Sequence, residues 1–176
     1  MIDLHVTDEQ KDYTHRQVAQ YNFGMRGVAD GTKDQQFTGI LGETVFADYM
    51  GLPRPDGRKG FDGGHDFVIG EEIFVDVKTM GRTVSVKERY VHNFFGLQKN
   101  YNVHYYIFQS YNKREHIITI CGYVSHDELL KLASLYPKGS IRTRDDGSTL
   151  LTKADLYEIK QSDLHPVFDI SQFLGR

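Results

Sequence analysis

The sequence contains very little cysteine, since Cys121 is the only one among 176 residues. Intramolecular disulfides are therefore excluded, and a zinc site built from thiolates is not expected. Cys121 ends the apolar run 117–121, where a buried and unreactive thiol is expected. The eight histidines are scattered, and no pair has the spacing of metal ligands on a helix.

Long apolar runs are also lacking. No stretch approaches the roughly 20 apolar residues that span a bilayer. Residues 1–11 are polar and acidic, unlike a signal peptide, so an intracellular protein with no membrane partner is expected. A basic excess is absent as well. The formal net charge of −3 argues mildly against a nucleic-acid partner, although a local basic patch can still bind one.

The composition that remains is that of a globular protein, with 39% apolar and 26% charged residues. The length suits one domain spanning 1–176.

Two helices are predicted early in the chain. The segment 7–10 has capping-box form and begins a helix reaching about Asn22, followed by a glycine-containing loop over 23–32. Apolar residues within 37–49 recur at helical spacing before Gly51.

The rest of the chain favours strands. Runs at 66–69 and 73–78 flank the short connection 70–72, which indicates a hairpin. Further strands are predicted at 83–86, 103–109, 117–124 and 156–159, whereas 88–100 is ambiguous and compatible with a helix. A capping box at Ser125 begins a helix that reaches about Leu135, and a last helix is expected near 170–174. Helices, then a mixed sheet, then a helix together predict one α/β domain.

The predicted hairpin gathers charged side chains on one face. Side chains alternate along 73–78, so the aliphatic residues share a core face while Asp76 and Lys78 share the other. If 70–72 form a three-residue loop, Asp66 lies opposite Asp76, with Cβ atoms roughly 4.5–5.5 Å apart. Two such carboxylates repel each other unless a cation lies between them, and Mg²⁺ favours oxygen ligands of this kind.

A second interpretation of the hairpin stays open at this point. The two acids can simply point to water on a solvated hairpin, and a two-residue loop would put them on opposite faces. The spacing alone does not choose between a metal site and this solvated surface.

The order of these residues resembles a nuclease family. The segments 63–66 (GGHD) and 74–78 (FVDVK) are similar to the PD-(D/E)xK signature of the restriction-endonuclease-like superfamily. In that signature an Asp ends one strand, and the next strand carries an acid, one residue and a lysine. Glu43 matches the glutamate that these nucleases often carry on a preceding helix, and Gly39 one turn earlier leaves that face open. His65 departs from the pattern by standing where it has proline.

The resemblance implies a restriction-endonuclease-like mixed central sheet flanked by helices. It also implies a Mg²⁺-dependent endonuclease that hydrolyses DNA phosphodiester bonds, with Mn²⁺ as a substitute. The implied catalytic residues are Asp66, Asp76, Lys78 and Glu43, and the implied metal ligands are Asp66, Asp76, the Val77 carbonyl and Glu43. A lysine beside two carboxylates tends to stay charged, which favours an electrostatic role for Lys78 over that of a base.

Basic residues around the hairpin are the candidate DNA contacts. They are Arg54, Arg58, Lys59, Arg82 and Lys87, with Arg89, Lys138, Arg142 and Arg144 as further basic residues. A solvated loop explains each group equally well. The alternative function is a catalytically silent DNA-binding or regulatory module on the same fold. A homodimer is a further expectation, because a chain this small has little room for a separate targeting domain.

Overall fold

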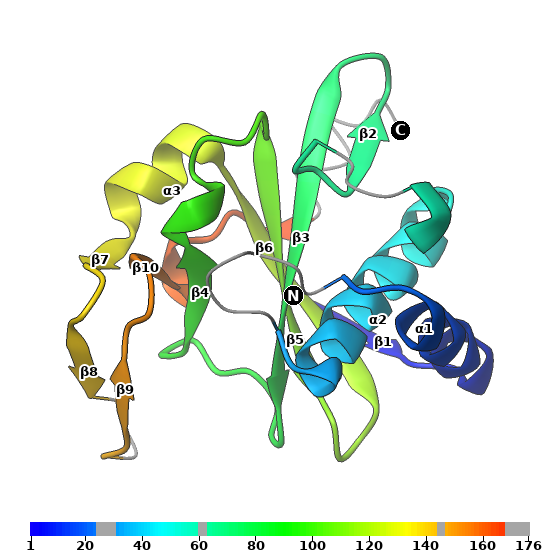
Figure 1. Cartoon of the computed structure of the whole chain (residues 1–176), viewed down its shortest axis with the longest axis horizontal. Helices are drawn as coiled ribbons and strands as arrows, with labels where there is room; N and C mark the ends of the chain where they lie inside the picture. Colours follow the sequence, from blue (N-terminus) through cyan, green and yellow to red (C-terminus); the bar gives the residue numbers. More distant parts are fainter. Residues whose placement is uncertain (24–30, 60–62, 144–146, 168–176) are drawn as a thin grey trace.

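A five-stranded mixed sheet forms the centre of the computed structural model, which describes residues 1–23, 31–59, 63–143 and 147–167 (Figure 1). Its strand order is β1-β6-β5-β3-β2, and the strands are β1 (Ile2–His5), β2 (Phe67–Ile69), β3 (Ile73–Arg82), β5 (Tyr105–Asn112) and β6 (Ile117–Ser125). β3 pairs with β5 in parallel, whereas β2 pairs with β3, β5 with β6, and β6 with β1 antiparallel.

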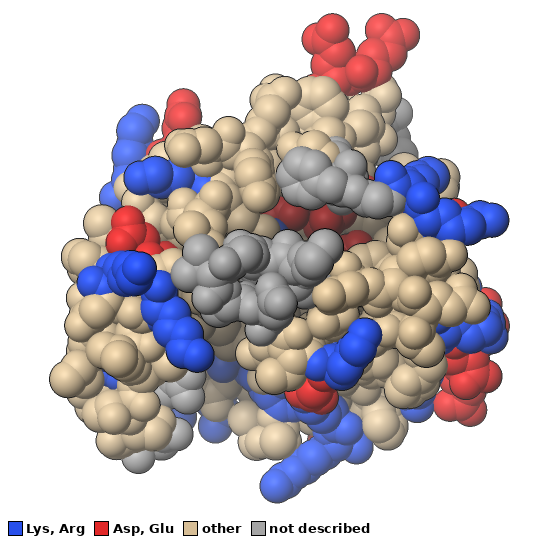
Figure 2. Space-filling model, in the orientation of Figure 1, with Lys and Arg blue, Asp and Glu red and all other residues tan. Residues whose placement is uncertain are grey.

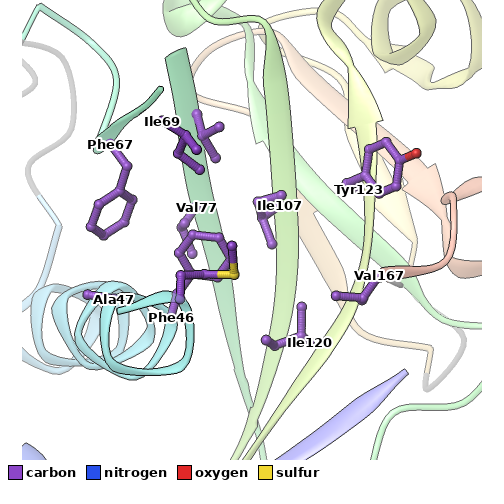
Figure 3. Packing of buried hydrophobic residues seen from close by; sticks show 11 residues of the cluster. Phe46, Ala47, Phe67, Ile69, Val77, Ile107, Ile120, Tyr123 and Val167 are labelled. Atoms are coloured by element: carbon purple, nitrogen blue, oxygen red, sulfur yellow. The ribbon is translucent and has the colours of Figure 1, made fainter. Parts of the chain in front are cut away.

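Two helices, α1 (Asp8–Gln20) and α2 (Lys33–Met50), pack against each other, and α2 covers one face of the sheet. Thr7 and Thr32 cap them with complete capping boxes, in which each threonine and the Gln three residues later exchange hydrogen bonds. α2 ends at Gly51, whose left-handed backbone (φ 67°) suits glycine. Aromatic and aliphatic side chains of α2 fill the space above β2, β3 and β5, as Figure 3 shows for Phe46 and its neighbours.

The opposite face is covered by a second sheet of order β4-β10-β7 and by α3 (His126–Leu132). The strands of this second sheet are β4 (Val91–Phe95), β10 (Leu156–Lys160) and β7 (Ser134–Tyr136). A separate hairpin is formed by β8 (Ile141–Thr143) and β9 (Thr149–Leu151). The described residues also contain the 3-10 turns η1 (Gly57–Lys59), η2 (Gly96–Gln98) and η3 (Gln161–Asp163). Buried residues of this side include Phe94, Tyr106, Phe108 and Leu129. The fold is therefore mixed α/β with helices on both sides, as predicted.

Several predicted elements are confirmed. These are the first two helices, the hairpin with its three-residue loop, the strands at 103–109, 117–124 and 156–159, and the capped start of the helix after Ser125. Cys121 is buried, and burial raises the pKa of its thiol to about 12, as expected for an unreactive cysteine. The expected helix near 170–174 and most of the loop over 23–32 lie outside the described residues.

Other predictions were wrong because long-range pairing overrides local patterns. No separate strand forms at 83–86, since β3 continues to Arg82 alongside β5. The segment 88–100 contains β4 and a 3-10 turn in place of a helix, because β4 pairs along its whole length with β10. The helix after Ser125 ends at Leu132, and β7 follows it. Within the described residues, no helix is long and apolar enough to cross a membrane.

Candidate active site

The β2–β3 hairpin brings Asp66 beside β3. The register Ile69↔Ile73 and Phe67↔Val75 is the one that a three-residue loop predicts, and it sets Asp66 across from Asp76. β2 begins only at Phe67, so the edge of β3 beyond Val75 is not paired by that strand. The Asp66 backbone N–H donates to the Val75 carbonyl at 3.0 Å. The Asp66 carboxylate occupies the next position along this edge.

The backbone N–H and carbonyl of Val77 both lie along this unpaired edge of β3. Asp66 Oδ2 accepts the Val77 N–H at 2.6 Å. Because the N–H and C=O of one residue in a strand point to the same side, the Val77 carbonyl faces this edge too. The residues predicted to supply oxygen ligands, Asp66 and the Val77 carbonyl, are therefore neighbours.

Asp76 and Lys78 lie on the face of β3 opposite Val75 and Val77, and Asp76 Oδ2 forms an ion pair with Lys78 Nζ. Asp76 is only 5% exposed, and the Lys78 side chain is 20% exposed. Burial acts to lower the pKa of the Lys78 ammonium, but the charges of Asp76 and Asp66 outweigh it and raise this pKa. Lys78 therefore stays charged near neutral pH. In the described structure, the cation beside the two hairpin acids is the Lys78 ammonium.

Glu43 reaches the same cluster from α2. Burial, followed by the charges of Glu43 and Asp76, raises the pKa of the Asp66 carboxyl well above its usual range. The charge of Glu43 also contributes to raising the pKa of the Lys78 ammonium. Three carboxylates and one ammonium, drawn from α2, the hairpin and β3, therefore form one electrostatic cluster.

Glycines of α2 explain how Glu43 reaches the cluster. A Cβ on Gly42 would lie 1.8 Å from Thr79 Oγ1, so α2 approaches β3 more closely than any other residue type allows. A Cβ on Gly39 would meet nothing within 4 Å. Gly39 and Glu43 line a surface depression of α2 and the chain around it, and Asp66, Asp76 and Lys78 are not among its lining residues, which are Phe23, Gly31, Gln35, Gln36, Gly39, Ile40 and Glu43. Figure 2 shows acidic side chains at the bottom of a hollow over β3 on this face of the molecule.

The donor set fits a divalent cation in kind. Carboxylate and carbonyl oxygens are the ligands that Mg²⁺ prefers, and the cluster has three carboxyl groups and one ammonium. In the part of the chain that the structure describes, however, no three His, Cys, Asp or Glu side chains stand close enough to hold a metal as they are. In this arrangement Asp66 accepts the Val77 N–H and Asp76 pairs with Lys78.

The predicted DNA contacts differ in how they are engaged. Arg54 is engaged by acidic side chains of the protein itself, because its guanidinium donates to Glu9 at 2.6 and 2.7 Å and to Asp48 at the same two distances. Arg82 donates to the Val91 carbonyl at 2.8 Å. The remaining residues, Arg58, Lys59 and Lys87, are exposed, with Arg58 bound to the neighbouring Asp56.

The basic residues later in the chain also differ in whether they are exposed enough to contact DNA. Arg142 pairs with the buried Glu158 at 2.9 Å, and Arg144 lies outside the described residues. Lys138 and Arg89 are exposed. These partners could not be predicted from local sequence patterns. Arg54 lies six residues from Asp48 and 45 residues from Glu9, and Arg142 lies 16 residues from Glu158.

Aromatic residues beside the cluster were also missed. The rings of His65 and Phe74 lie 4.5 Å apart between centroids, and those of Phe74 and His104 lie 5.3 Å apart. Alternation along β3 already indicates that Phe74 shares a face with Asp76, but nothing local links His104 to them.

No family model, curated protein or solved structure is significantly similar to this chain. The likeness to PD-(D/E)xK nucleases therefore depends on the motif residues alone.

Proposed function

We propose that this protein is a metal-dependent nuclease that hydrolyses DNA phosphodiester bonds. The observation that carries the proposal is the hairpin geometry, which sets Asp66 against the Val77 N–H and Asp76 beside Lys78, with Glu43 near enough for its charge to act on Asp66 and Lys78. These residues come from different elements, and they are the four that the nuclease signature names. The restriction-endonuclease-like version of the α/β fold is part of the same proposal.

The roles follow from the charge of the substrate. A phosphodiester repels nucleophiles, so a site that hydrolyses it must neutralise negative charge. Asp66, Asp76, the Val77 carbonyl and Glu43 would hold a divalent cation, which would supply a Lewis acid and lower the pKa of an attacking water. Lys78 stays protonated beside the acids, so it orients the water and stabilises charge on the phosphate, and it does not act as a base.

One observation favours a second candidate, a DNA-binding or regulatory module without turnover. Lys78 already neutralises Asp76, and no three-residue metal cluster is preformed among the described residues. A site of this kind is stable without a cation. The two candidates differ in whether divalent cations bind and whether DNA is cleaved.

Plasmid, linear, single-stranded and branched DNA are the substrates to test, and at least one of them should be cleaved with Mg²⁺ or Mn²⁺ and remain intact with EDTA. The cation should also raise the melting temperature, because a ligand that binds only the folded state stabilises it by mass action. Gel electrophoresis and thermal denaturation measure the two effects. A cation-dependent shift without cleavage of any substrate would support the silent module, and the absence of both effects would remove the metal site.

Glu43→Gln should reduce cleavage by about 10- to 100-fold, because it removes one acid from the cluster but keeps the helix and the side-chain shape. The folded protein should keep its stability to within about 0.5 kcal/mol, as is usual for substitutions outside the core. The matched control is Glu71→Gln, at the exposed tip of the hairpin. Equal rates for both variants would take Glu43 out of the site.

A further inference from the structure

The rings of His65, Phe74 and His104 form a row across the start of β2, β3 and β5. The Phe74 and His104 rings are nearly parallel, with an angle of 13° between their planes. His104 is exposed and Phe74 is half-buried. The row therefore presents a flat aromatic surface to solvent at its His104 end.

The His104 ring is held rigidly. Its Nδ1 accepts the Phe74 backbone N–H at 3.0 Å, and the His104 backbone N–H donates to the Phe74 carbonyl at 2.9 Å. The second bond continues the parallel main-chain pairing of β3 and β5 beyond Val75↔Tyr105, and the first joins the ring itself to β3. A ring fixed in this way loses little conformational freedom when another ring stacks on it.

The row lies next to the acidic cluster. Phe74 and Asp76 are two residues apart on one face of β3, about 6.6 Å along the strand. His65 directly precedes Asp66 in the chain. A nucleotide whose phosphate contacts the cluster therefore has its base within reach of the rings.

We infer that His65, Phe74 and His104 form a stacking platform for an unpaired nucleobase beside the phosphate that is cleaved. Bases inside a duplex are covered on both faces by their neighbours, so only an unpaired base can stack there. Base–aromatic stacking is tolerant of sequence and strengthens single-strand binding. This inference rests on the proposed nuclease function and narrows its substrate to single-stranded DNA or the single-stranded part of a branched molecule.

Two substitutions of His104 separate stacking from structure. His104→Asn keeps an acceptor for the Phe74 N–H but removes the ring, whereas His104→Phe keeps a ring but removes the acceptor. With Ca²⁺ in place of Mg²⁺, His104→Asn should bind a single-stranded oligonucleotide roughly 5- to 100-fold more weakly than the parent. His104→Phe should bind it about as tightly as the parent, and duplex binding should be equal for all three proteins. Fluorescence polarisation measures these affinities.

The absence of tryptophan from the chain provides a direct reporter. His104→Trp introduces a single indole on the platform, and a stacked base should quench its fluorescence. His5→Trp is the matched control, because His5 is an exposed histidine on β1, the opposite edge strand of the sheet. Its fluorescence should not change when single-stranded DNA is added.

Three outcomes would overturn the platform. The first is that His104→Asn binds single strands as the parent does. The second is that duplex quenches His104→Trp as strongly as single strands do, and the third is that the parent fails to bind single strands. Failure of the nuclease proposal looks different, because single-strand binding and quenching would then follow the pattern above while no DNA is cleaved with Mg²⁺.

Discussion

Asp76→Asn should lower DNA cleavage by several orders of magnitude while leaving the protein folded. Asparagine keeps the shape of the side chain but removes one carboxylate from the proposed ligand set, and the bound cation accounts for both charge neutralisation and water activation. The melting-temperature rise with Mg²⁺ should shrink or vanish for the same reason. Cleavage of plasmid or single-stranded DNA, compared with Glu71→Gln, measures the first effect.

The effect of Asp76→Asn on stability changes sign once the ion pair with Lys78 is taken into account. The hairpin alone predicts relief of repulsion between Asp66 and Asp76, and thus a metal-free protein of equal or greater stability. In the structure Asp76 is 5% exposed and pairs with Lys78, so asparagine leaves a largely buried ammonium without its nearest partner. Removing one partner of a buried pair costs about 3–5 kcal/mol.

The loss for Asp76→Asn should be smaller than that range. Asp66 and Glu43 still act on Lys78, so we expect the free energy of unfolding to fall by about 1–3 kcal/mol. Urea denaturation without divalent cations measures it. A variant that cleaves DNA normally would place the active centre elsewhere. An unfolded variant would show that Asp76 serves chiefly as a structural partner of Lys78.

The hairpin could be predicted from the sequence because its determinants are local. Alternation along β3 sets the face of Asp76 and Lys78, and the three-residue loop sets the register that opposes Asp66 to Asp76. The capping boxes at Thr7 and Ser125 likewise fixed where two helices begin, since the motif spans only four residues.

The partners of these residues could not be predicted in the same way. The Arg54 contact with Glu9 joins residues 45 positions apart, and the His104 contact with Phe74 joins residues 30 apart. Such contacts depend on the order of the strands and on the packing of α1, which no local pattern specifies. The four-residue strand β1 was not predicted for a similar reason, because its conformation depends on pairing with β6.

Gly42 illustrates how one local choice in the sequence positions the site. Its added Cβ would lie 2.7 Å from Thr79 Cβ and 2.8 Å from Gln109 Oε1, in addition to the 1.8 Å contact with Thr79 Oγ1. Thr79 Oγ1 in turn donates to Gln109 Oε1 at 3.0 Å. Because Thr79 Cβ is fixed to the backbone of β3, a methyl group here has to move α2 away from the sheet.

Gly42→Ala should therefore lower the free energy of unfolding by about 1–3 kcal/mol, as overpacking of a close contact does. It should also reduce cleavage by about 100-fold, since a shift of roughly 1 Å in a group that positions the reaction has that effect. Gly39→Ala is the matched control one turn earlier on the same helix. Its Cβ meets nothing within 4 Å, so alanine should raise stability by about 0.5–1 kcal/mol through helix propensity. Thermal unfolding and Mg²⁺-dependent cleavage of the two variants measure both effects. If Gly42→Ala is as stable and as active as the parent, the close approach of α2 to β3 is not what positions Glu43.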